Sequence, residues 1–183
     1  TDLMAPAGYG TRVEGLHAVA AALRAGRVIT LYVERSRAGR TDISALAAQL
    51  RPNQIRTVDD VRPLAGGDAP QGVVAECRPM LPVTLDQLCS PDAALLVLDH
   101  IEDPRNVGAV ARSAVAAGIT GLVVSSRRAA PLSAVAFKTA AGALEDLAIA
   151  VVGSIPEALS RLKAGGLWIV GLDASGDQSL FNL

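Results

Sequence analysis

The second half of the chain alternates short, uninterrupted apolar runs with segments of helical periodicity. The apolar runs predict strands at residues 94–98, 121–125, 148–152 and 167–172, and the segments between them predict helices at 104–117, 133–144 and 156–163. Continuous apolar strands that alternate with helices are typical of an α/β fold, a parallel sheet covered by helices on both faces. Ligands of such sheets bind beyond the carboxyl ends of the strands, so we expect a functional site at that edge.

The first 78 residues predict a separate, smaller α/β domain. Strands are expected at 28–33, 54–58 and 72–77, and helices at 16–23 and 43–50, the second with Asp42 as its N-cap. Residues 62–70 (RPLAGGDAP) have the composition of a loop. We therefore divide the chain into a tail (1–8), a small domain (9–78), a proline-containing linker (79–93) and a larger domain (94–183).

The composition bounds the class of protein. Half of the residues are hydrophobic and 19% are charged, which predicts a folded chain. No apolar run approaches the roughly 20 residues of a membrane span, and the first residues lack the layout of a secretory signal. Cys77 and Cys89 have neither a CxxC spacing nor a His-rich partner motif, so we expect no disulfide framework and no metal site, and a reducing cytoplasm.

The charge is divided unevenly along the chain. Residues 1–78 hold ten arginines and eight acids, a local charge of +2, and the remainder carries −3. Arginine suits planar, bidentate contacts with phosphate, although a solvated surface is the simpler interpretation of charge alone. Only 3% of the residues are aromatic, which argues against a stacking platform for bases.

The most informative segment is 98–118 (LDHIEDPRNVGAVARSAVAAG). Asp103 is suited to cap a helix, Pro104 to its first position and Gly118 to the position after its end. At about 100° per residue, one face of this helix is apolar and must face the core, and it carries Val107, Val110, Ala111 and Ala114. Two arginines share the opposite face, Arg105 and Arg112, with Asn106 and Ser113 at the border.

Residues 103–109 (DPRNVGA), 112–114 (RSA) and 117–118 (AG) resemble the first signature motif of the SpoU (TrmH-like) RNA 2′-O-methyltransferases. The similarity extends to residues 14–19 (EGLHAV) and 71–74 (QGVV), which resemble the opening and the closing of that family's ribosomal-protein-like substrate-binding domain. Lys138 with 141–143 (AGA) is similar to a further family segment. The resemblance covers nearly all of 9–183 and is closest to the group that modifies a guanosine of 23S rRNA.

The resemblance implies a SPOUT-type methyltransferase fold, S-adenosylmethionine as cofactor, RNA (above all rRNA) as substrate and a homodimer. It assigns Asn106 and Arg112 to the catalytic site, with the arginine activating the ribose hydroxyl. Because a guanidinium has a pKa above about 12, we expect Arg112 to hold a phosphate and to stabilise the forming alkoxide rather than to accept a proton.

The remaining polar residues have plainer interpretations beside functional ones. Five arginines are candidate RNA contacts, although each can equally be a solvated side chain: Arg12, Arg35, Arg105, Arg127 and Arg128. Asp103 is interpreted as a helix cap, His17 as a structural histidine, and Glu145 with Asp146 as a solvated pair.

The family's second and third motifs, which form the knot and much of the cofactor pocket, are not found before Leu183. The remaining candidates for the cofactor edge are Leu172, Asp173 and Ala174. We expect a polypeptide ending at Leu183 to lack the knot and to show little methyl transfer. Calorimetry with S-adenosylmethionine checks this, and tight binding by the 183-residue polypeptide would contradict it.

Other functions are consistent with parts of the pattern. A non-catalytic rRNA-binding protein, or the same chemistry on tRNA or in antibiotic resistance, fits the resemblance as well. A small-molecule enzyme with a nucleotide cofactor is disfavoured because no strand is followed by GxGxxG or by a P-loop. A pure interaction protein does not account for the placement of Asn106 and Arg112.

Overall fold

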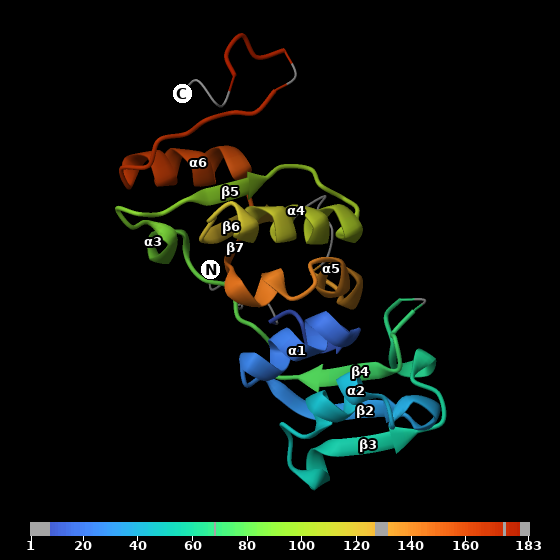
Figure 1. Cartoon of the computed structure of the whole chain (residues 1–183). Coiled ribbons are helices and arrows are strands. Elements are labelled where there is room, and N and C mark those ends of the chain that lie inside the picture. The colour runs from blue at the N-terminus through green and yellow to red at the C-terminus, as the bar shows by residue number, and fades with distance from the viewer. Residues whose placement is uncertain (1–7, 68, 127–131, 174, 180–183) are drawn as a thin grey trace.

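A computed structural model describes residues 8–67, 69–126, 132–173 and 175–179, and shows two α/β parts stacked end to end (Figure 1). The N-terminal part is a four-stranded sheet in the order β1-β4-β2-β3, in which only β2 and β3 run parallel. Its elements are β1 (Arg12–Glu14), α1 (Leu16–Arg24), β2 (Val28–Glu34), α2 (Thr41–Ala47), β3 (Ile55–Val58) and β4 (Val73–Cys77). Three 3-10 turns join them: η1 (Arg35–Arg37), η2 (Pro52–Gln54) and η3 (Arg62–Leu64).

The C-terminal part contains a parallel sheet in the order β5-β6-β7. Its elements are α3 (Leu85–Leu88), β5 (Leu95–Leu98), α4 (Pro104–Ala116), β6 (Gly121–Ser125), α5 (Ala134–Thr139), η4 (Ala143–Asp146), β7 (Ala148–Val152) and α6 (Ile155–Ala164). The predicted α/β class with a parallel, helix-covered sheet is therefore confirmed, and β6 and β7 have the predicted bounds.

The two faces of this sheet have different neighbours, because successive side chains of a strand point to opposite sides. Leu122, Val124 and Ile149 belong to the cluster that includes α4 and α5, whereas Val123 and Ala150 pack with α3 and α6. Figure 1 shows α6 on one side of the sheet and α4 and α5 on the other, facing α1. The sheet is thus covered on both faces.

One hydrophobic core runs through both parts of the molecule. The same buried cluster contains residues of β1, α1 and β2 together with residues of α4, α5 and β7. Phe137 of α5 is fully buried at the junction, and its ring is tilted against Tyr9 at a centroid distance of 6.5 Å. A Cβ on Gly142 would lie 2.6 Å from Cβ of Ala21, so α1 approaches η4 closely only because a glycine stands there. The parts are packed against each other as parts of one body.

A buried ion pair closes this junction. Arg27 donates from Nε to Oε2 of Glu145 at 2.8 Å and from Nη2 to Oε1, and the two side chains are only 11% and 3% exposed. Burial disfavours the charged guanidinium, but the hydrogen bonds and the attraction of Glu145 outweigh burial and raise the pKa of Arg27. The guanidinium carbon also lies 5.9 Å from the centroid of the Phe137 ring.

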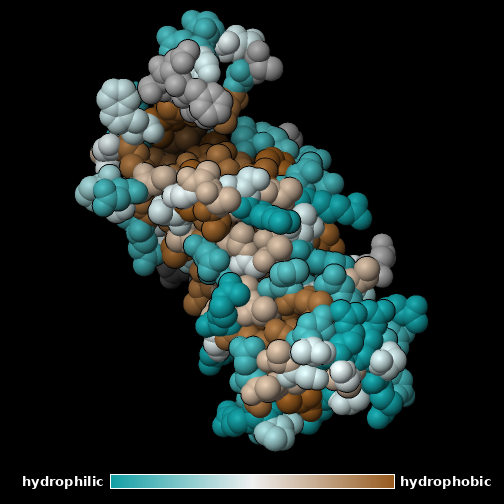
Figure 2. All heavy atoms as spheres, in the orientation of Figure 1, coloured by the Kyte–Doolittle hydropathy of each residue, from teal (hydrophilic) through white to brown (hydrophobic). Residues whose placement is uncertain are grey.

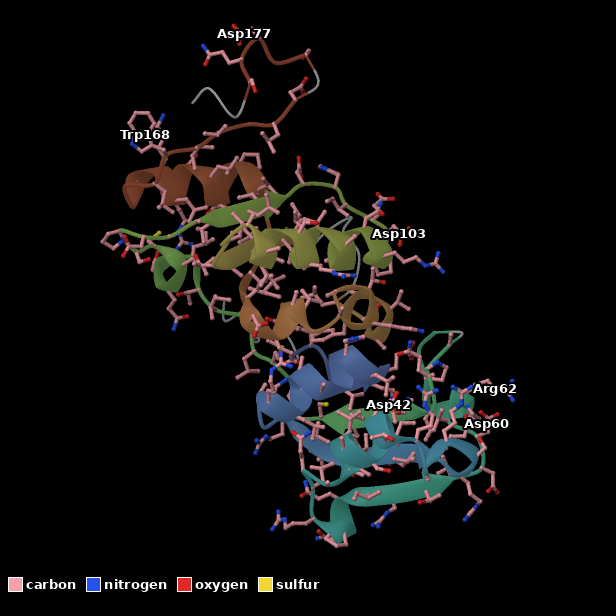
Figure 3. All side chains as sticks on the ribbon, viewed as in Figure 1. Asp42, Asp60, Arg62, Asp103, Trp168 and Asp177 are labelled. Carbon is pink, nitrogen blue, oxygen red and sulfur yellow. The ribbon has the colours of Figure 1, made fainter. Side chains whose placement is uncertain are left out.

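The structure corrects several expectations. Residues 167–172 form no strand, and Trp168 and Leu172 are 96% and 72% exposed; Figure 3 shows Trp168 pointing away from α6. The helix expected at 133–144 is divided into α5 and η4. Helix α2 begins at Thr41 and is preceded by Arg40, so Asp42 lies in its first turn and is not its N-cap. Glu145 is buried and paired rather than solvated, whereas Asp146 is exposed.

Within the described ranges no helix is long and apolar enough to cross a membrane. In the same part of the chain, no cluster of three or more histidine, cysteine, aspartate or glutamate side chains is arranged to hold a metal ion.

We predict that Glu145→Gln lowers the free energy of unfolding by about 3 kcal/mol, because it leaves the Arg27 charge buried without its counter-ion. Urea denaturation followed by circular dichroism measures the loss. Asp60→Asn is the matched control, since it breaks an ion pair between exposed groups, Asp60 and Arg62. Equal midpoints for both variants would contradict the importance of the buried pair.

Candidate functional site

The site begins where β5 ends and α4 starts. The chain leaves the carboxyl end of β5 at Leu98 and enters α4 at Pro104, and Asp103 caps the helix by accepting a hydrogen bond from the backbone N–H of Arg105 at 2.8 Å. Figure 3 labels Asp103 at the open end of this helix. The predicted cap and the predicted first helical position are therefore confirmed. The first turn of α4 stands at the edge of the sheet where ligands of parallel sheets bind.

The predicted buried and exposed faces of α4 are confirmed as well. Val107, Ala111 and Ala114 are buried and Val110 is partly buried, whereas Arg105 and Arg112 are exposed. Gly108 is also buried, which the face analysis did not include. A Cβ at Gly108 would lie 2.5 Å from the carbonyl oxygen of Ala136 and 2.7 Å from Cβ of Thr139. A glycine here lets α4 approach α5, and this contact sets the orientation of the polar face.

Asn106 and Arg112 are exposed, and neither side chain hydrogen-bonds to another residue that the structure describes. They are six residues apart, so their Cα atoms are separated by about 9 Å along the helix axis. At about 100° per residue they also stand about 120° apart around the helix, so the two side chains do not lie one above the other. Both side chains are exposed on α4.

The arginines predicted to contact RNA lie in different parts of the structure. Arg105 lines a cleft between the two parts of the molecule, together with Lys138 of α5 and the start of α1. Arg12 lies exposed in β1, and Arg35 pairs with Asp59 at 2.8 Å on the N-terminal part. Arg127 and Arg128 lie outside the described residues. Of the three arginines that the structure describes, only Arg105 is brought next to other charged groups at the junction of the two parts.

The described cofactor-edge candidates lie in the exposed segment that follows α6. Leu172 and Asp173 are exposed, and the Asp173 carboxylate accepts hydrogen bonds from the backbone N–H and the hydroxyl of Ser175. These bonds hold the pKa of Asp173 below its usual range. Ala174 lies outside the described residues. The residues described at this place therefore do not by themselves fit around a molecule the size of S-adenosylmethionine.

Three features escaped the sequence analysis. Asp99 and His100 follow β5 directly, with Nδ1 of His100 2.7 Å from Oδ1 of Asp99, and the φ of His100 is +53°. A left-handed backbone at a residue other than glycine is uncommon and often accompanies function. His17, interpreted as structural, is exposed and lines the cleft beside Arg105. Glu14 is completely buried at the same cleft.

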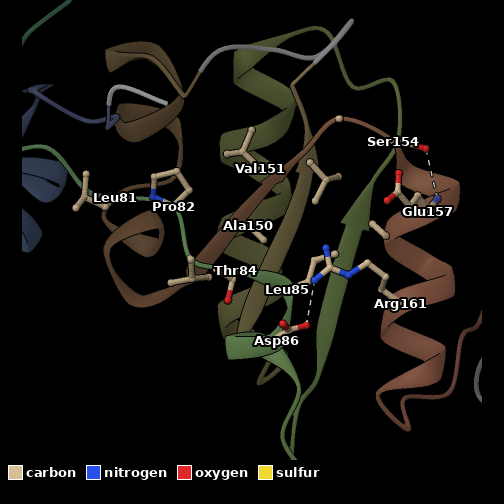
Figure 4. A pocket seen from close by; sticks show the side chains of 14 residues that line it. Leu81, Pro82, Thr84, Leu85, Asp86, Ala150, Val151, Ser154, Glu157 and Arg161 are labelled. Atoms are coloured by element: carbon tan, nitrogen blue, oxygen red, sulfur yellow. Dashed lines mark hydrogen bonds and ion pairs between the residues drawn. The ribbon is translucent and has the colours of Figure 1, made fainter. Parts of the chain in front are cut away.

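A larger groove lies elsewhere. It has a volume of about 840 Å³ and runs between residues 81–86, β7 and α6 (Figure 4). Arg161 and Asp86 form an ion pair across it at 3.1 Å, with Arg161 donating. None of the predicted site residues lines it, so its size alone does not make it the site.

Comparison with known proteins identifies the class. Residues 93–183 match the profile of the SpoU rRNA methylase family, and residues 12–82 match the profile for RNA 2′-O ribose methyltransferase substrate binding. The 23S rRNA (guanosine-2′-O-)-methyltransferase RlmB of Vibrio vulnificus (strain CMCP6) is 30% identical over 182 residues, which are 92% of this chain and 72% of the relative. The chain belongs to the SpoU family of RNA methyltransferases.

Other relatives are longer than the matched part. An uncharacterised tRNA/rRNA methyltransferase of Mycobacterium avium (strain 104) is 36% identical over 129 residues, 68% of this chain and 42% of that protein. Among solved structures, the SpoU methyltransferase AviRb of Streptomyces viridochromogenes, in complex with AdoMet, superposes with a TM-score of 0.66 at 26% identity, over 84% of this chain and 58% of AviRb. The chain thus spans about half of the length of several relatives.

We predict that Gly108→Ala destabilises the protein by about 1–2 kcal/mol, because the forced separation of α4 from α5 outweighs the better helix propensity of alanine. Thermal unfolding measures the change. Gly39→Ala is the control, since no atom lies within 4 Å of the added methyl group. An unchanged stability in Gly108→Ala would show that the helix contact is looser than described.

Proposed function

We propose that this protein transfers a methyl group from S-adenosylmethionine to the ribose 2′-hydroxyl of an RNA nucleotide, first of all a guanosine of 23S rRNA. Membership of the SpoU family and the likeness to RlmB support this proposal. The observation that carries it is the exposure of Asn106 and Arg112 on α4, the helix that begins beyond the carboxyl end of β5. The alternative substrate is tRNA, since the M. avium relative is named an uncharacterised tRNA/rRNA methyltransferase.

The side chains define what the site does to the RNA. The guanidinium of Arg112 binds the phosphate beside the target ribose and stabilises the negative charge that forms on the 2′-oxygen. Asn106 donates to or accepts from the ribose and holds it in line. The 2′-hydroxyl exists in RNA and not in DNA, which makes RNA the substrate.

The methyl donor is part of the proposal, supported by the family and by the AviRb complex with AdoMet. S-adenosylmethionine supplies an electrophilic methyl group on a sulfonium. Because Leu172 and Asp173 are exposed and enclose no pocket, we assign no residue of the described chain to holding it.

We further propose a cytoplasmic homodimer. An rRNA substrate places the protein with the ribosomes. Large exposed apolar side chains follow α6, namely Trp168, Ile169, Val170 and Leu172, and Figure 2 shows apolar atoms gathered in a hollow next to the C-terminal segment. Exposed apolar patches of this kind mark contact surfaces.

The test uses the full-length protein that carries this sequence, tritiated S-adenosylmethionine and total RNA. We predict that Arg112→Ala lowers methyl incorporation about 100-fold or more, because it removes a donor to the developing charge. Arg56→Ala, which changes an exposed arginine of β3, should leave the rate unchanged.

Two results would contradict the proposal. Equal rates for wild type and Arg112→Ala would remove Arg112 from the site. Salt-dependent RNA binding without methyl incorporation by the wild type would favour the non-catalytic rRNA-binding alternative. In that case the region that matches the substrate-binding profile, residues 12–82, would account for the RNA binding.

A further inference from the structure

A cleft of about 550 Å³ lies at the junction of the two parts, and we call it the junction cleft. Its walls come from the start of α1, residues 66, 67, 69 and 71, the first turn of α4 and helix α5. The polar side chains that line it are Glu14, His17, Gln71, Arg105, Lys138 and Thr139. The cleft therefore combines groups from the substrate-binding region with groups from the methyltransferase region.

Glu14 is the unusual member of this set. The residue is completely buried, and its Oε2 accepts hydrogen bonds from the backbone N–H groups of Gly66 and Gly67 at 2.7 and 3.1 Å. Its Oε1 has no hydrogen-bond partner among the described residues. Buried polar atoms are nearly always hydrogen-bonded, so an unpaired carboxylate oxygen on the wall of a cleft indicates a place for a ligand donor.

Lys138 covers this oxygen without satisfying it. Its Nζ lies 3.5 Å from Oε1 of Glu14, longer than an N–H···O hydrogen bond, and donates instead to the carbonyl oxygen of Ala69 at 2.5 Å. The lysine side chain is 28% exposed, so its flexible stem can turn outward. A ligand that draws the ammonium group away uncovers Oε1.

The rim of the cleft is suited to an anion. Arg105 and Lys138 both line it, and the first turns of α1 and α4 face it with the positive ends of their dipoles. Gln71 already caps α1 by accepting from the N–H of Leu16 at 3.0 Å. A ligand that fits this lining carries negative charge towards the rim and a hydrogen-bond donor towards Glu14. A nucleotide within RNA has both, a phosphate and a base.

We propose that the junction cleft binds one nucleotide of the RNA and that Oε1 of Glu14 accepts a hydrogen bond from the exocyclic amino group of its base. This rests on the proposed function. Adenine, cytosine and guanine carry such an amino group. Uracil offers on this edge only its N3–H, which lies between two carbonyl oxygens that the carboxylate repels. Because Arg105 precedes Asn106 in α4, this nucleotide is a neighbour of the one that is methylated.

The test compares two pyrimidine heptamers, rC7 and rU7, each of which presents the same base in every register. Their bases differ at position 4, amino in cytosine and oxo in uracil, and at N3, which carries a proton only in uracil. Fluorescence anisotropy with the full-length protein should give about tenfold tighter binding of rC7, the effect of one hydrogen bond to a charged group.

Glu14→Gln sharpens the test. The amide oxygen must face the N–H groups of Gly66 and Gly67, so the amide NH2 faces the cleft and donates to O4 of uracil. The preference for rC7 should disappear or reverse. Arg105→Gln is the matched variant: it removes a charge at the rim that forms no ion pair with Glu14, so it should weaken both heptamers equally and leave their ratio unchanged.

Every outcome decides the matter. Equal binding of rC7 and rU7 by the wild type, or an unchanged preference in folded Glu14→Gln, overturns the role of Glu14 while the proposed function stands. Absence of all RNA binding overturns both. If Glu14→Gln does not fold, as judged by circular dichroism, the wild-type ratio and its constancy in Arg105→Gln still confirm or reject the inference.

Discussion

The ion pair between Arg27 and Glu145 is the interaction on which the arrangement of the two parts depends. Arg27 stands just before β2 and Glu145 lies in η4, so the pair connects elements that are 118 residues apart. Two charges taken out of water persist only while they face each other, and neither part could keep its own charge buried alone. With Phe137 and Gly142 beside it, the pair fixes α1 against α5. The position of Lys138 over Glu14 follows from this packing.

Helix α4 serves both sides of this arrangement. Its buried face packs closely against α5 because Gly108 has no side chain. Its first turn, capped by Asp103, lies at the junction of the two parts. The polar face then presents Arg105 to the cleft and leaves Asn106 and Arg112 exposed. One helix therefore carries both the proposed nucleotide contact and the two proposed catalytic residues.

Much of this could be predicted from periodicity, because apolar spacing reports which side of an element is buried. Strands β6 and β7 and the faces of α4 followed directly. The segment at 167–172 has the composition of a strand but no neighbour to pair with in the structure, and composition does not report pairing. The three residues of β1 are too few to show an alternation. Glu145 and the junction cleft were missed because their partners come from distant parts of the chain, which local patterns do not register.

Arg27 also donates from Nη1 to the carbonyl oxygens of Gly10 and Arg78. Gly10 lies at the start of the N-terminal part and Arg78 lies at its end. The guanidinium of Arg27 therefore hydrogen-bonds to both ends of this part. A domain whose two ends are held together at one point can be exchanged as a unit. Because Glu145 lies outside residues 10–78, a chimera that exchanges this segment between members of the family must keep both Arg27 and its glutamate partner.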